Sequence, residues 1–121
     1  MQDQETEHSA KGVIAPDASI PVARMVESIV GCKWSLTVLD LVKAGQNRPG
    51  AMVRAVEGLT TKVLNERLVK MQRFGILSKV IYPESPPRVE YELTPFGRKF
   101  LGILEGIAAL QGELDSEPPA R

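Results

Sequence analysis

Residues 59–98 read LTTKVLNERLVKMQRFGILSKVIYPESPPRVEYELTPFGR. Over 62–74 the apolar residues recur every three or four positions, which predicts a helix with one apolar face. Two β-rich runs follow at 76–82 and 88–93, and the second alternates apolar and charged residues as a half-buried strand does. Three of the five residues between these runs are prolines, which have no amide hydrogen to donate to a ladder. This order predicts a helix followed by an antiparallel β-hairpin with a stiff, projecting tip.

Three further helices are expected before this stretch. Apolar spacing predicts short helices over 22–30, 34–44 and 51–56, each followed closely by a glycine that suits a helix end. After the hairpin, Thr94 and the proline that follows it begin a last helix, expected to run to about Leu114. The resulting order, α-α-α-α-β-β-α, is mainly α with a small antiparallel β-hairpin and is typical of a winged helix-turn-helix.

The chain is expected to form one domain over residues 20–115, with terminal helices that serve dimerisation. Residues 1–19 mix acids with Gln, Ser, Gly and Pro without periodicity, so we predict a flexible arm there and a frayed tail over 116–121. No apolar run approaches the roughly 20 residues that span a bilayer, and the first residues are acidic. We therefore expect a cytoplasmic protein without membrane contact.

Composition argues against several classes of protein. Cys32 is the single cysteine and His8 the single histidine, which leaves neither a disulfide framework nor a His/Cys metal site. The sequence has no glycine-rich phosphate loop and no cluster of carboxylates on a common face, so an enzyme is not expected. We predict no cofactor and no metal.

The formal net charge is zero, but its distribution along the chain is uneven. Residues 1–21 and 105–121 each carry four acids against one base, whereas residues 48–99 carry ten Lys and Arg against five Glu. A basic centre between acidic ends favours one face of positive potential. The basic segment is the one that contains the predicted helix and hairpin.

This arrangement predicts recognition of DNA. A helix fits the major groove, its first turn presents side chains to base edges, and its free amide groups attract phosphate. The hairpin after it can lie along the backbone or in the minor groove, where basic side chains neutralise phosphates. The DNA-binding residues predicted on these grounds are Thr60, Thr61, Lys62 and Asn65 on the helix, with Lys79 and Arg88 on the hairpin.

Three segments carry a resemblance to a known family: VGCKW at 30–34, LTTKVLNERL at 59–68 and PPRVEYELTPFGR at 86–98. Over roughly residues 22–110 the chain resembles the HxlR family of transcription regulators. The resemblance implies a winged-helix homodimer that acts as a repressor or activator and responds to electrophiles, oxidants or small aromatic compounds. The sequence departs from the family at 48–52, RPGAM, where members usually begin a helix with arginine and phenylalanine.

Two residues near the first helix have alternative interpretations. Cys32 is interpreted as a small, buried apolar residue, or as a redox sensor whose thiolate is favoured by the neighbouring lysine and the start of the next helix. The resemblance places the thiol of the family's known sensors further toward the N-terminus. Trp34 is interpreted as a core anchor, with ligand stacking as the alternative. Arg67 is interpreted as a partner in an ion pair, with Glu57 or Glu90, or as a phosphate contact.

The last helix has apolar residues at alternating spacings of three and four, the pattern that packs one helix against another. Together with the first helix it is predicted to form a homodimer, which suits a palindromic operator because two recognition helices reach half-sites about 34 Å apart. The expected partners are double-stranded operator DNA, a second copy and a small-molecule effector. The rival hypothesis is a winged-helix interaction module that binds proteins and not DNA. The predicted dimerisation residues are Met25, Ile29, Phe100, Ile103, Ile107 and Leu110.

Overall fold

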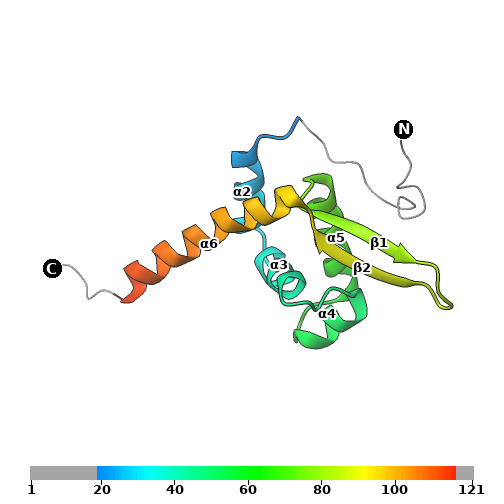
Figure 1. The fold of residues 1–121 in the computed structure, drawn as a ribbon. Helices are drawn as coiled ribbons and strands as arrows, with labels where there is room; N and C mark the ends of the chain where they lie inside the picture. The colour runs from blue at the N-terminus through cyan, green and yellow to red at the C-terminus, as the bar shows by residue number, and fades with distance from the viewer. Residues whose placement is uncertain (1–18, 117–121) are drawn as a thin grey trace.

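The computed structural model describes residues 19–116 (Figure 1). The predicted order of elements is confirmed within them. The predicted arm over 1–19 and the predicted tail over 116–121 lie almost wholly outside the described residues, as does His8. The elements are α2 Val22–Val30, α3 Ser35–Lys43, α4 Pro49–Ala55, α5 Thr61–Arg73, β1 Leu77–Tyr82, β2 Arg88–Leu93 and α6 Pro95–Ser116.

Three helix starts differ from the prediction, and that of α5 moves by a single residue, to Thr61. Helix α4 begins at Pro49 and not at residue 51, because proline lacks the amide hydrogen that a first helical residue leaves unbonded in any case. Helix α3 begins at Ser35, so the prediction that Trp34 belongs to it is wrong. The φ of Trp34 is 77°, a left-handed conformation that no residue inside an α-helix adopts.

The core lies where α2, α3, α4, α5 and the hairpin meet the first half of α6. Its fully buried side chains include Ile29, Val38, Met52 and Leu64. The burial of Met52 anchors α4 at the point where the sequence departs from the family pattern. Because protein interiors pack at crystal-like density, these contacts hold α3, α4 and α5 in one orientation relative to each other.

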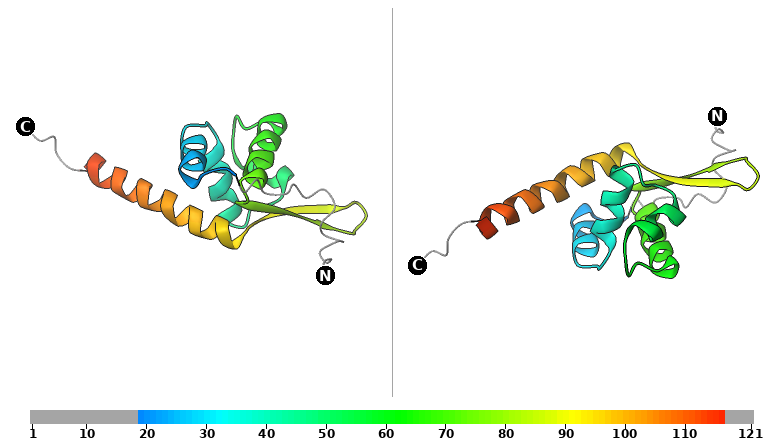
Figure 2. Two further views of the ribbon diagram at one scale, coloured as in Figure 1. Left: turned by 90° about the horizontal axis from the view of Figure 1, so that it is seen from above. Right: turned by 90° about the horizontal axis from the view of Figure 1, so that it is seen from below.

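The two strands pair antiparallel, with Leu77 opposite Leu93 and Tyr82 opposite Arg88. The hairpin projects away from the helices on the side opposite to the free end of α6 (Figure 2). Thr94 joins the hairpin to α6: its hydroxyl donates to the carbonyl of Gly75 and accepts from the amide of Gly97 at 2.8 Å. The predicted cap at Thr94 is thus confirmed.

Helix α6 is the longest element, and only its first half is covered by the body (Figure 2). Phe100, Leu101 and Leu104 are buried, whereas every residue from Glu105 to Ser116 is exposed. Of the helices over residues 19–116, none combines the length and the apolar character that a membrane crossing needs.

Candidate nucleic-acid interface

Helices α4 and α5 and the turn between them form a helix-turn-helix. Gly58 lies in this turn with φ 93°, a conformation that glycine adopts without strain. A Cβ atom at Gly58 would lie 3.5 Å from the ring of Trp34, so the indole packs directly on the turn. This contact supports the core-anchor interpretation of Trp34, whose ring also has the Lys33 ammonium 5.1 Å from its centre.

The first turn of α5 presents polar side chains to solvent. The hydroxyl of Thr60 accepts the amide hydrogen of Val63 at 3.2 Å, so Thr60 is the N-cap of α5. Thr61, Lys62 and Asn65 are exposed, and their side chains make no hydrogen bond or ion pair to other parts of residues 19–116. Their contact with DNA stays a prediction, but nothing within the described chain obstructs it.

Two basic residues of α5 face the body of the protein. The Arg67 Nε donates to the carbonyl of Lys33 at 2.9 Å, and its guanidinium also lies 3.6 Å from Glu66. Lys70 donates to the carbonyl of Ser28 at 3.2 Å. Neither of the expected partners of Arg67, Glu57 and Glu90, pairs with it. These two bonds attach α5 to α2 and to the connection between α2 and α3, and so support the orientation of α5.

The two basic residues predicted on the hairpin occupy opposite faces. Lys79 is opposite Tyr91 and Arg88 is opposite Tyr82, and residues 79 and 82 differ by an odd number of positions. Side chains alternate between the faces of a strand, so these two cations point to different sides. Lys79 is half-buried and forms no ion pair within residues 19–116.

Arg88 belongs to a network of ion pairs within the protein. It pairs with Glu84 at 3.0 Å and with Glu90 at 2.6 Å, and its guanidinium stacks 3.8 Å from the ring centre of Tyr82. Hydrogen bonds to Glu84 and Glu90 raise the pKa of Arg88 further above its ordinary value. A phosphate near Arg88 would therefore compete with two carboxylates.

Glu90 extends this network of ion pairs to Arg48, the N-cap residue of α4. The sequence did not predict this contact. Its carboxylate accepts hydrogen bonds from Arg88 and, at 3.3 Å, from the Nε of Arg48. The bond from Arg88 lowers the pKa of Glu90 below its ordinary value, with a smaller contribution from Arg48 and an opposing one from desolvation. The spacing of Arg88 and Glu90 on one strand face was a signal for their pairing, but no local pattern indicated Arg48.

Cys32 is half-exposed in the connection between α2 and α3, so the expectation of a buried apolar residue is only partly met. Burial alone would raise its pKa, but the neighbouring polar groups of Lys70 and Ser35 and the charges of Lys70 and Arg67 outweigh it and lower the pKa. Within residues 19–116, no three His, Cys, Asp or Glu side chains gather closely enough to hold a metal ion.

The predicted dimerisation residues fall into two groups. Met25, Ile29 and Phe100 are at most 5% exposed, so they belong to the protomer's own core and have almost no surface to offer a second chain. Ile103, which faces away from the body in the first half of α6, and Ile107, in its outer half, are exposed. Leu110, at 61%, continues the same face. Spacing alone could not separate the two groups, because both follow the same helical period.

The model of a family described as HxlR-like helix-turn-helix matches residues 29–117. The chain belongs to this family. The family resemblance seen in the sequence is thereby confirmed, and the match extends from α2 to just beyond α6.

Relatives with similar sequences are named as HTH-type transcriptional regulators. One from Synechocystis sp. is 40% identical over 84 residues, which cover 69% of this chain and 62% of the relative. YtcD of Bacillus subtilis is 32% identical, with 67% of this chain and 64% of that protein covered. YtfH of Escherichia coli is 31% identical, with 80% of this chain and 75% of that protein covered. The matched segment thus spans less than two thirds of the first two relatives.

Solved structures of similar proteins have the same fold. A regulator named as a MarR-family member from Enterococcus faecalis matches with a TM-score of 0.68 at 32% identity, over 77% of this chain and 84% of that one. YtcD matches with a TM-score of 0.69 at 26% identity, over 81% of this chain and all of that one. The fold is a winged helix-turn-helix.

Proposed function

We propose that this protein is a transcription regulator that binds operator DNA through α5 and the hairpin. The observation that carries the proposal is the exposed first turn of α5, where Thr61, Lys62 and Asn65 are free of bonds to the rest of residues 19–116. Asparagine recognises adenine through two hydrogen bonds, and lysine binds guanine or phosphate. The bonds from Arg67 and Lys70 keep this turn in a fixed orientation, which lowers the entropic cost of recognition.

We propose further that the protein acts as a homodimer. Ile103, Ile107, Leu110 and Leu114 are between 43% and 63% exposed on one helix, an apolar strip unusual for the surface of a monomer. A groove of about 340 Å³ continues this strip onto α2 and α3, where Val30 and Leu36 are also exposed. A two-fold contact through this surface would cover the strip and present two α5 helices to a palindromic operator. We infer repression as the mode of action, since a dimer seated on an operator excludes other proteins from that DNA.

The test is a fluorescence anisotropy titration with the DNA upstream of the protein's own gene at two salt concentrations. Lys62→Ala should reduce the slope of log affinity against log salt by about 0.9, and Asn65→Ala should reduce discrimination between operator and competitor DNA. Arg73→Ala is the matched control, because Arg73 is an exposed cation at the opposite end of α5. Binding that is insensitive to salt and to Lys62→Ala would overturn the proposal and favour a protein-interaction module.

Cys32 supports a second proposal, a redox response. Its lowered pKa raises the share of thiolate, the form that attacks hydrogen peroxide to give a sulfenic acid and release hydroxide. Lys70 also anchors α5 to Ser28, so a change at the sulfur would act on the orientation of that helix. HypR, a protein of known structure that is 26% identical to this chain, is named as a redox regulator. Peroxide should weaken DNA binding of the wild type, reductant should restore it, and Cys32→Ser should respond to neither.

A further inference from the structure

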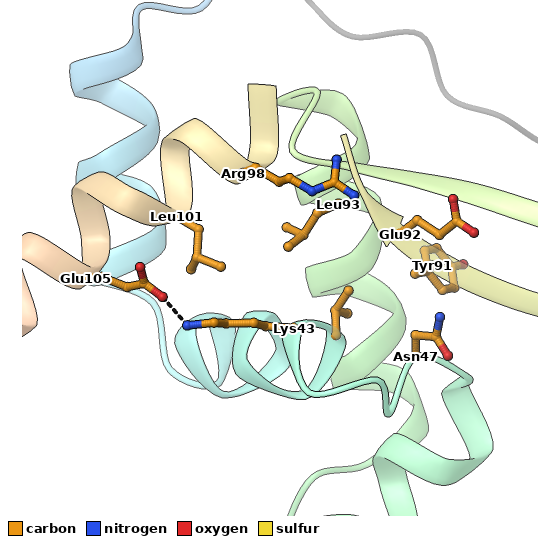
Figure 3. A pocket seen from close by; sticks show the side chains of 9 residues that line it. Lys43, Asn47, Tyr91, Glu92, Leu93, Arg98, Leu101 and Glu105 are labelled. Atoms are coloured by element: carbon orange, nitrogen blue, oxygen red, sulfur yellow. Dashed lines mark hydrogen bonds and ion pairs between the residues drawn. The ribbon is translucent and has the colours of Figure 1, made fainter. Parts of the chain in front are cut away.

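A second hollow of the surface lies where three elements meet. It has a volume of about 640 Å³ and lies between α3, β2 and the first half of α6 (Figure 3). The amide of Tyr91 donates to the carbonyl of Asn47 at 2.9 Å, which holds the loop after α3 against the strand. The cleft is therefore bordered by packed elements on three sides.

The floor of the cleft is apolar. Val42 of α3, Tyr91 of β2 and Leu101 of α6 are each at most 7% exposed, and Leu93 is half-buried beside them. Desolvation by burial raises the pKa of Tyr91, so the phenol stays neutral. These side chains suit the apolar part of a small ligand.

The charges around the floor leave one cation without a partner. Lys43 and Glu105 form an ion pair across the cleft and neutralise each other, as the dashed line in Figure 3 marks. Glu92 contributes to the rim, but it lies between Tyr91 and Leu93 on the strand, so its side chain belongs to the other face, as Figure 3 shows. Arg98 extends over Leu93 and forms no ion pair with any residue of 19–116. The cleft consequently combines an apolar floor with one free guanidinium.

We propose that this cleft binds a small organic carboxylate that carries an apolar group. The carboxylate pairs with Arg98, whose planar guanidinium offers two parallel N–H donors, and the apolar group covers Tyr91, Leu93 and Leu101. The amide side chain of Asn47 lies at the edge of the cleft and is available to a polar substituent of the ligand.

The position of the cleft makes such a ligand an effector, an interpretation that rests on the proposed DNA-binding function. A bound molecule would contact α3 of the body, β2 of the hairpin and α6, the helix proposed to join the two protomers. Its binding energy would therefore favour one angle of α6 and the hairpin relative to the body over others. That angle sets the separation of the two α5 helices on DNA.

Binding is tested on the DNA-free protein by NMR titration of backbone amides with three probes. Phenylacetate has both required groups, phenylacetamide lacks the charge, and acetate lacks the apolar group. For a probe of this size we expect a Kd of about 1 mM for phenylacetate. The largest shifts should fall at Asn47, Tyr91, Leu93 and Leu101, and both incomplete probes should bind at least about tenfold more weakly.

The matched variants are Arg98→Gln and Lys99→Gln, which remove one charge each from neighbouring positions of α6, and only Arg98 lines the cleft. Arg98→Gln should weaken phenylacetate binding about ten- to a hundredfold, while Lys99→Gln should leave it unchanged. Equal binding by both variants, equal binding of phenylacetamide, or shifts located elsewhere would overturn the proposal.

Anisotropy with DNA separates this proposal from the proposed function. Phenylacetate should change the DNA affinity of the wild type and of Lys99→Gln, but not that of Arg98→Gln. If the wild type does not bind DNA in the absence of phenylacetate, the proposed regulatory function is refuted. The titration of the DNA-free protein decides independently whether the cleft binds carboxylates.

Discussion

Gly97 is the position at which the structure makes the sharpest quantitative prediction. It lies in the first turn of α6, against Ile76 in the connection between α5 and β1. A Cβ atom added there would lie 3.0 Å from the carbonyl carbon of Ile76 and 3.2 Å from its Cα, and closer still to its carbonyl oxygen. All three are backbone atoms, and the oxygen also accepts the amide hydrogen of Thr94 at 3.0 Å.

Gly97→Ala must therefore displace α6 from the hairpin and loosen the packing of Phe100 beneath it. We expect a strain of about 3–4 kcal/mol, above the usual range for overpacked cores because backbone atoms must move, offset by a gain in helix propensity of about 0.5–1 kcal/mol. The free energy of unfolding should fall by about 3 kcal/mol. Gly102→Ala is the matched control on the same helix, because nothing lies within 4 Å of its added Cβ. The control should gain about 0.5–1 kcal/mol.

The assay is urea unfolding followed by circular dichroism at one fixed protein concentration, since dimerisation couples stability to concentration. With a slope of about 1.5 kcal/mol per M, Gly97→Ala should lower the midpoint by about 2 M and Gly102→Ala should raise it by about 0.5 M. A Gly97→Ala midpoint as high as that of Gly102→Ala would show that α6 does not approach Ile76 as closely as described, and the reasoning would fail.

Three further predictions concern the interface. Thr60→Ala removes the cap of α5 and should cost about 1 kcal/mol in the same unfolding assay, with Thr60→Ser nearly neutral. Arg88 lowers the pKa of Glu90 in the folded protein. The ionised Glu90 therefore contributes its full stabilisation above the unfolded pKa of about 4.3, and this contribution is lost as the pH falls through the lower folded pKa. Between neutral and acid pH, the urea midpoint of Glu90→Gln should accordingly fall less than the midpoint of the wild type. Glu84→Gln removes one of the two carboxylates that pair with Arg88 and should strengthen binding to DNA at low salt. The slope of log affinity against log salt should become steeper by up to about one. An unchanged slope would mean that Arg88 does not contact phosphate.

Much of the fold was predictable because its signals are local. The spacing of Leu64, Leu68 and Met71 indicates a helix wherever that helix is placed, and the alternation over 88–93 indicates a strand in the same way. The cap at Thr94 could likewise be identified from neighbouring residues alone. The exposure of the first turn of α5 followed from this same local information, because helical residues that do not face the core must face solvent.

Only the tertiary structure decided which surfaces meet. Phe100 and Ile107 have the same helical spacing, and their division between core and surface depends on where the body ends along α6. The pairing of Arg67 with the Lys33 carbonyl, the ion pair of Lys43 with Glu105 and the cleft beside it all join residues more than thirty positions apart. A periodic pattern specifies the direction of a side chain relative to its own helix or strand and contains no information about the element that packs against it. The sequence alone therefore determined the elements, their order and the family, while long-range packing determined which charges are paired and which remain free to bind a ligand.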